Sequence, residues 1–137
     1  IIGPDPSHFI NSNENVQFTG ELYGEDLKHI LRKVDVAISS MALEKLEMYV
    51  GSPLKTRWYL ALGIPVILGY RDEALDPSSE YILEIKPEDW PLNNNMISVI
   101  EKFVKNWNNK RINSLKSEEI SAQKIEKDRI DFLLKRL

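Results

Sequence analysis

Short apolar runs alternate along this chain with longer segments that have helical spacing. Runs that predict buried strands lie at residues 36–38, 66–68 and 81–85. In two segments, residues 25–34 and 93–107, apolar side chains recur at the interval of a helix turn, which predicts amphipathic helices. Strands that alternate with helices, and that are apolar on both faces, are typical of a parallel sheet covered by helices. The order therefore predicts half of a doubly wound α/β fold, with its ligand crevice at the carboxyl ends of the strands.

Two further apolar stretches near the start of the chain each run into a glycine. Residues 1–2 are followed by Gly3, and the strand-like alternation at residues 16–19 is followed by the segment Gly20–Leu22. Glycine lets the backbone turn sharply and approach a ligand closely, and backbone groups after a strand can contact the edge of a nucleobase. Two ordinary turns are the alternative, and the pattern alone favours them.

The sharpest local signal covers residues 52–68. Ser52 is predicted to cap a helix with its hydroxyl, and Pro53 suits the first helical position because its missing N–H costs nothing there. Gly63 can take the left-handed conformation that ends helices, and Pro65 prevents continuation. The segment therefore predicts a loop, a helix and a buried strand in succession.

The start of that predicted helix is a candidate anion site. Free backbone N–H groups, the Ser52 hydroxyl and the side chains of Lys55 and Arg57 would surround a phosphate group. Lys55 adds a mobile point charge, whereas Arg57 either grips the phosphate through two N–H groups or pairs with a nearby carboxylate. The alternative is a capped structural helix with two surface cations, and the pattern alone favours it.

Composition removes several other classes of chemistry. The 137 residues contain no cysteine, which excludes disulfides, thiolate metal sites and cysteine nucleophiles. The net charge of −3 argues against non-specific nucleic-acid binding, and no apolar run approaches the ~20 residues of a membrane span. Phosphate-binding loop, dinucleotide and serine-hydrolase motifs are absent, and His8 and His29 lack the spacing of metal ligands. No metal is expected.

Three more side chains near the candidate site have two interpretations each. Glu44 and Glu47 are either catalytic or ribose-binding carboxylates, or part of a solvated face. Trp58 either stacks on a base or sugar ring, or packs in the core. No residue is assigned a catalytic role.

Taken in order, four segments resemble the C-terminal half of a group 1 glycosyltransferase of the GT-B fold. They read IIGP at residues 1–4, VQFTGEL at 16–22, DVAIS at 35–39 and SPLKTRWYLALGIPVI at 52–67. The resemblance covers residues 1–85, and the end of the chain is compatible with it. In that family two Rossmann-like domains face each other, and the C-terminal one binds the nucleoside-diphosphate sugar. The resemblance thus implies a three-layer Rossmann-like domain in which helices flank a parallel sheet.

The resemblance also implies where the sugar donor lies. The base would rest against Gly20, Glu21 and Leu22. The diphosphate would lie over the helix start formed by Ser52, Leu54 and Lys55, which stabilises the leaving group without a metal or other cofactor.

The chain departs from the family pattern at three places. Trp58 stands where members commonly carry a glutamate that hydrogen-bonds the donor ribose, and Val50 stands where they carry another acid. Glu47 lies three residues from that second place and would compensate only in a shifted loop. The basic residues that clamp the diphosphate normally precede the strand that ends at residues 1–2.

The expected whole protein is a glycosyltransferase that moves a sugar to a glycan or lipid-linked acceptor. We expect residues 1–137 to be a single donor-binding domain from a longer cytoplasmic enzyme, with or without docking on the inner membrane face. The acceptor site would belong to an N-terminal domain, against which a last helix at residues 121–137 would pack. Two alternatives stay open: a non-catalytic scaffold or partner subunit, and a sugar-nucleotide epimerase with the same two-domain plan.

Overall fold

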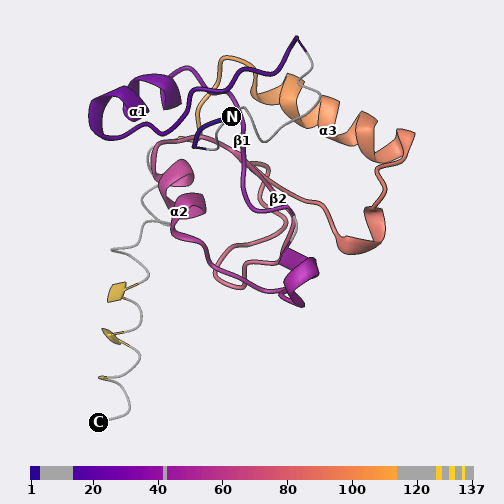
Figure 1. The fold of residues 1–137 in the computed structure, drawn as a ribbon. Helices are drawn as coiled ribbons and strands as arrows, with labels where there is room; N and C mark the ends of the chain where they lie inside the picture. The colour runs from indigo at the N-terminus through magenta and orange to yellow at the C-terminus, as the bar shows by residue number, and fades with distance from the viewer. Residues whose placement is uncertain (4–13, 42, 114–125, 128–129, 132–133, 135–137) are drawn as a thin grey trace. The chain divides into compact units, whose positions relative to one another are not determined.

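The computed structural model describes residues 1–3, 14–41, 43–113, 126–127, 130–131 and 134 (Figure 1). The chain divides into two compact units, each with its own contacts. Unit 1 spans Ile1–Val34 and unit 2 spans Asp35–Leu137.

Unit 1 combines a backbone bridge with one helix. Ile2 pairs with Gly20 in an isolated parallel bridge, and the Gly3 N–H donates to the Gly20 carbonyl at 2.8 Å. Helix α1 spans Gly24–Leu31 and confirms the helix predicted there. The prediction of a regular strand at residues 16–19 is wrong. In the described part of unit 1, the β pairing beside this segment is the isolated bridge between Ile2 and Gly20. Gly3 and Gly20 both have positive φ, so the backbone bends out of the extended conformation at each.

Unit 2 contains a small open sheet of three parallel strands in the order β1-β2-β3. The strands are β1 at Ala37–Ile38, β2 at Val66–Leu68 and β3 at Ile82–Glu84. Val66 lies opposite Ala37 on one side and Ile82 on the other. The predicted parallel α/β arrangement is therefore confirmed for this unit.

The prediction that β1 is buried on both faces is wrong. Ala37 is buried, but the next side chain, Ile38, is 62% exposed. Successive side chains of a strand point to opposite faces, and β1 has a partner on one edge only within the described part of unit 2. All three residues of the central strand β2 are buried, as predicted.

Helix α2 spans Leu54–Ala61 and connects β1 to β2, while α3 spans Asn94–Trp107 and follows β3. Short 3₁₀ turns lie at Leu43–Leu46 (η2) and Pro87–Asp89 (η3). Two parallel strands joined through a helix form a βαβ crossover, so the start of α2 lies toward the carboxyl ends of the strands. Figure 1 shows α2 beside the strands, and the helix is in contact with β2.

The prediction is confirmed at the end of α2 and wrong at its start. Gly63 has φ +72, which confirms the left-handed turn after the helix. The start is shifted by one residue: Pro53 is the N-cap, with extended backbone and no side-chain cap. The predicted cap by Ser52 is wrong, because the Ser52 Oγ instead accepts a hydrogen bond from Arg57 Nη2 at 2.9 Å. The Arg57 guanidinium therefore donates to the hydroxyl oxygen that was predicted to accept from a backbone N–H of the first turn.

Helix α3 confirms the predicted amphipathic helix and has a side-chain cap. The Asn93 Oδ1 accepts from the Met96 N–H at 2.9 Å, which satisfies one of the free amides of the first turn. At the other end, the Trp107 Nε1–H donates to the Glu80 carbonyl, and the Asn109 N–H donates to Asp35 Oδ1. Glu80 precedes β3 and Asp35 precedes β1, so these bonds attach the end of α3 to the amino ends of the strands.

The last predicted helix is described only in part. Residues 126–127, 130–131 and 134 are helical, and the side chains of Ile130 and Leu134 are exposed. Residues 121–125 and the other positions of this helix lie outside the described residues, so its packing against a further domain stays a prediction. In the part of the chain that the structure describes, no helix is long and apolar enough to cross a membrane.

Candidate ligand site at the carboxyl edge of the sheet

The carboxyl ends of the three strands, together with the start of α2, form the candidate site of unit 2. The segments that leave the strands begin at Ser39 after β1, at Gly69 after β2 and at Ile85 after β3. In open parallel α/β sheets, ligands bind in the crevice outside these ends. The sequence analysis expects the ligand crevice at the same edge, and that expectation stays a prediction.

Three buried hydroxyl groups hold this edge together. Ser39 Oγ lies 2.7 Å from Thr56 Oγ1 and 3.0 Å from the Tyr70 hydroxyl, and Thr56 Oγ1 lies 2.5 Å from the Tyr70 hydroxyl. Each hydroxyl can donate one proton and accept another, so the three close a ring in which every group is satisfied. The ring joins the end of β1, the first turn of α2 and the end of β2.

Replacing Tyr70 with phenylalanine is expected to lower the free energy of unfolding by about 1–2 kcal/mol, because two of the three bonds disappear inside the core. Urea unfolding followed by circular dichroism measures this change. The matched control is Tyr49→Phe, since Tyr49 is largely exposed and its hydroxyl is outside the ring. Equal stability losses in the two variants would contradict a stabilising role for the ring.

A buried ion pair connects α2 to the loop after β2. Arg57 Nη2 lies 2.5 Å from Asp72 Oδ1, and the two side chains are 7% and 1% exposed. The same carboxylate oxygen accepts from the Ala74 N–H at 3.1 Å. Of the two roles considered for Arg57, the structure places it in the pair with a carboxylate rather than at a phosphate. Within the described residues, Arg57 Nη1 and Asp72 Oδ2 have no hydrogen-bond partner.

The start of α2 brings together the residues predicted to lie near the diphosphate. Ser52, Leu54 and Lys55 are all exposed there, and Leu54 is 83% exposed. In the described part of the chain, the Lys55 ammonium takes part in no ion pair. Trp58 lies one turn further along α2 and is 38% exposed, so it is not a core residue. A free cation therefore stands beside the amides of an accessible helix start.

The predicted base-binding residues belong to unit 1. Gly3 and Gly20 are brought together by the backbone bridge, and Glu21 accepts a hydrogen bond from the Tyr23 hydroxyl at Oε2, at 2.6 Å. This bond and the nearby negative charge raise the pKa of Tyr23 above its ordinary value. Leu22 is half-buried. A joint site of these residues with α2 stays a prediction, because they belong to unit 1 and α2 belongs to unit 2.

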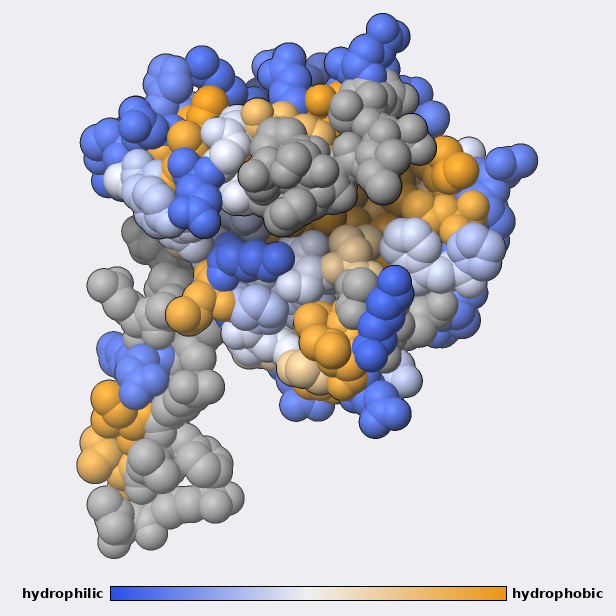
Figure 2. Space-filling model, in the orientation of Figure 1, coloured by the Kyte–Doolittle hydropathy of each residue, from blue (hydrophilic) through white to orange (hydrophobic). Residues whose placement is uncertain are grey.

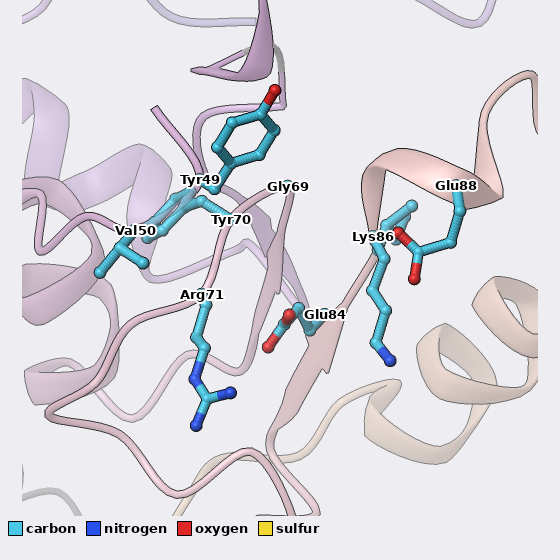
Figure 3. Close-up of a pocket in the computed structure, with 9 residues that line it drawn as sticks. Tyr49, Val50, Gly69, Tyr70, Arg71, Glu84, Lys86 and Glu88 are labelled. Atoms are coloured by element: carbon cyan, nitrogen blue, oxygen red, sulfur yellow. The ribbon is translucent and has the colours of Figure 1, made fainter. Parts of the chain in front are cut away.

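A pocket of about 230 Å³ lies at the carboxyl ends of β2 and β3 (Figure 3). Its lining residues are Tyr49, Val50, Gly69, Tyr70, Arg71, Glu84, Ile85, Lys86 and Glu88. Val50 forms a parallel bridge with Arg71, and the Arg71 N–H donates to the Tyr49 carbonyl at 3.0 Å, which fixes one wall. Apart from Val50, the sequence analysis did not connect these residues with a ligand. For Gly69, Tyr70, Arg71, Lys86 and Glu88, the available signal was their position directly after two predicted strands.

Gly69 allows the backbone to pass close to Met41 beside this pocket. The Gly69 N–H donates to the Ser40 carbonyl at 3.1 Å, and a Cβ atom at Gly69 would lie 2.6 Å from the Met41 Cα. Two main-chain segments therefore cross here at a distance that only glycine permits.

The loop before α2 is exposed and largely apolar. Glu47 is exposed with a left-handed φ of +55, while the Glu44 side chain lies outside the described residues. The large exposed apolar side chains of this loop are Leu46, Met48, Tyr49 and Val50, and Leu54 follows at the first position of α2. Figure 2 shows hydrophobic surface among the polar groups of one face. Among the described residues, no group of three or more His, Cys, Asp or Glu could hold a metal ion.

Lys55, the pocket and the hydroxyl ring all lie at one edge of a parallel sheet. Such an edge suits an anionic or hydroxylated small molecule. Comparison of the chain with family models, with curated proteins and with solved structures finds no match in any of the three.

Proposed function

We propose that this chain is the donor-binding domain of a glycosyltransferase, which transfers a sugar from a nucleoside diphosphate to a glycan or lipid-linked acceptor. The observation that carries the proposal is the accessible start of α2, where Ser52 and Lys55 stand at the carboxyl edge of the sheet and Lys55 has no ion-pair partner among the residues that the structure describes. A helix start has a partial positive charge and free amides, so it favours phosphate.

The chemistry required of such a site is the stabilisation of a leaving diphosphate. Negative charge develops on the diphosphate as the bond to the sugar breaks, and the amides of α2 and the Lys55 ammonium would stabilise it. Gly20, Glu21 and Leu22 would contact the base. The Arg57–Asp72 pair supports the site indirectly, because it holds α2 against the loop after β2.

In this proposal, the acceptor site and the catalytic groups lie on a second domain across the cleft. The exposed apolar side chains of the loop before α2 are consistent with a surface that another part of the protein covers. The whole enzyme would work in the cytoplasm, with or without docking on the inner membrane face.

The Lys55→Ala variant tests the diphosphate site. In the full-length protein, isothermal titration with uridine and guanosine diphosphates should show binding that the substitution weakens by about 1–3 kcal/mol, because a charge-assisted contact is lost. Lys102→Ala is the matched control, since Lys102 is an exposed lysine on α3. If the Lys55→Ala variant binds the diphosphates as tightly as the wild type, Lys55 is an ordinary surface residue and not part of a diphosphate site.

A non-catalytic scaffold or partner subunit is the second candidate function. It is favoured by Trp58 and Val50, which stand where the resembled family carries acids. No binding of either diphosphate at millimolar concentration would support this candidate. An epimerase of the same plan is distinguished by product analysis, because it would return an inverted sugar still attached to the nucleotide.

A further inference from the structure

We infer that the pocket at the ends of β2 and β3 binds one uncharged sugar ring. This inference deepens the proposed function and rests on it for the source of the sugar, which would be part of the donor or the acceptor. It concerns the side chains of Arg71, Lys86, Glu84 and Glu88, together with the apolar part of the pocket lining.

Equal numbers of positive and negative side chains line the pocket, and they can bond to a ligand. Two cations, Arg71 and Lys86, and two carboxylates, Glu84 and Glu88, line it. No ion pair joins any of the four within the described residues. Figure 3 shows Arg71 and Lys86 extending in the same direction on either side of the Glu84 carboxylate. A charged ligand would be attracted by one pair and repelled by the other while it loses part of its hydration, so its charge is a net cost.

A sugar ring carries several hydroxyl groups, which can form hydrogen bonds with cations and with carboxylates. Carboxylates accept hydrogen bonds from hydroxyl groups and the cations donate to them, and such charge-assisted bonds are the stronger ones. Vicinal hydroxyls of one sugar can therefore bond to Arg71 and Glu84 at the same time. A neutral polyol satisfies all four side chains without bringing a new charge into the pocket.

Part of the pocket lining is apolar. Val50 contributes an exposed aliphatic side chain, and Ile85 and Tyr70 also line the pocket but are almost completely buried. The Tyr70 hydroxyl is held in the ring with Ser39 and Thr56, so its polar end is already satisfied. The C–H face of a pyranose packs well on such a surface while its hydroxyls reach the charged rim.

The size of the pocket suits one ring. Its volume is about 230 Å³. Pockets for drug-sized ligands are larger, about 300–1,000 Å³. One hexose is of a suitable size, and a disaccharide would extend into solvent.

Nuclear magnetic resonance titration of the protein tests the inference with three probes: methyl glucoside, glucuronate and glucosamine. Methyl glucoside should shift the backbone amides of Gly69, Arg71 and Ile85, with a dissociation constant on the order of millimolar. The two charged sugars should bind several-fold more weakly.

Charge-changing variants should reverse that preference. The double variant Glu84→Gln/Glu88→Gln should raise the affinity for glucuronate, relative to methyl glucoside, by roughly tenfold. The double variant Arg71→Gln/Lys86→Gln should do the same for glucosamine. Glu101→Gln on α3 is the matched control and should leave all three affinities unchanged.

Two outcomes would overturn the inference. One is that methyl glucoside causes no shift at these amides, even at concentrations far above the expected millimolar dissociation constant. The other is binding of ethanolamine phosphate with no binding of methyl glucoside, which would make the pocket a site for zwitterions. Uridine and guanosine diphosphate titrations of the same samples, read at the Lys55 amide, keep the two proposals separate. Nucleotide binding without sugar binding overturns only the pocket, and sugar binding without nucleotide binding overturns the donor-domain proposal.

Discussion

Replacing Asp72 with alanine is expected to lower the free energy of unfolding by about 3–5 kcal/mol, because the Arg57 guanidinium would stay buried without its counter-charge. Arg57 is 7% exposed and has no second carboxylate among its hydrogen-bond partners in the described residues. A domain of this size has a total stability of about 5–15 kcal/mol, so the loss is a large share of it. Urea unfolding of the wild type and the variant measures the difference.

The double variant Arg57→Met/Asp72→Leu separates the loss of the pair from the burial of a lone charge. It should be less destabilised than Asp72→Ala, since replacing both members of a buried pair with apolar side chains leaves no unpaired charge. Glu101→Ala, which removes an exposed partner of Lys105, should cost at most about 1 kcal/mol. If Asp72→Ala costs no more than Glu101→Ala, the Arg57–Asp72 pair does not support the fold.

The second large effect is expected for Gly69→Ala. The added methyl would lie 2.6 Å from Met41 Cα and 3.0 Å from the Met41 carbonyl oxygen, which are main-chain atoms and cannot rotate away. Overpacking commonly costs about 1–3 kcal/mol, and a clash with main chain places this variant at about 3 kcal/mol or more. Thermal unfolding should show a clearly lower midpoint.

Gly51→Ala is the matched control for this variant. A Cβ atom at Gly51 would be 3.6 Å from Leu43 Cδ1, an ordinary contact, and its backbone φ is not in the left-handed region. Its stability should therefore change by less than about 1 kcal/mol, with a small gain from the stiffer unfolded chain. Similar midpoints for the two variants would mean that the chain crossing at Gly69 is not as tight as the structure shows.

The α2–β2 segment was predictable because its signals are local. Pro53 and Pro65 restrict the backbone at their own positions, and Gly63 permits the left-handed turn there, so these effects do not depend on the rest of the chain. The helix at residues 94–107 was predictable for a similar reason, since Asn93 caps it and apolar residues recur on one side. The parallel sheet followed from the order of these elements.

Long-range partners were not predictable from the same signals. Nothing local to Ser52 indicates that Arg57 will take its hydroxyl, because Arg57 is held in place by Asp72, fifteen residues further along the chain. The exposure of Ile38 likewise depends on which face of β1 other segments cover. These outcomes are set by packing between distant segments.

The pocket shows the same limit. Its walls come from the loop before α2, from the end of β2 and from the end of β3. The sequence predicted that ligands bind at this edge, but the meeting of Arg71, Glu84 and Lys86 around one hollow depends on the strand register. Leu68 lies opposite Glu84 in that register, which places the residues that follow the two strands near each other.

The triangle of Ser39, Thr56 and Tyr70 can be closed in two senses, clockwise or anticlockwise, since each hydroxyl rotates about its own C–O bond. Reversing the sense moves three protons and no heavy atom. The three O–H bonds point head to tail around the triangle in either sense, so their dipoles largely cancel and neither sense gives this edge a strong local field. The end of the sheet thus keeps one arrangement of heavy atoms with two interchangeable arrangements of protons.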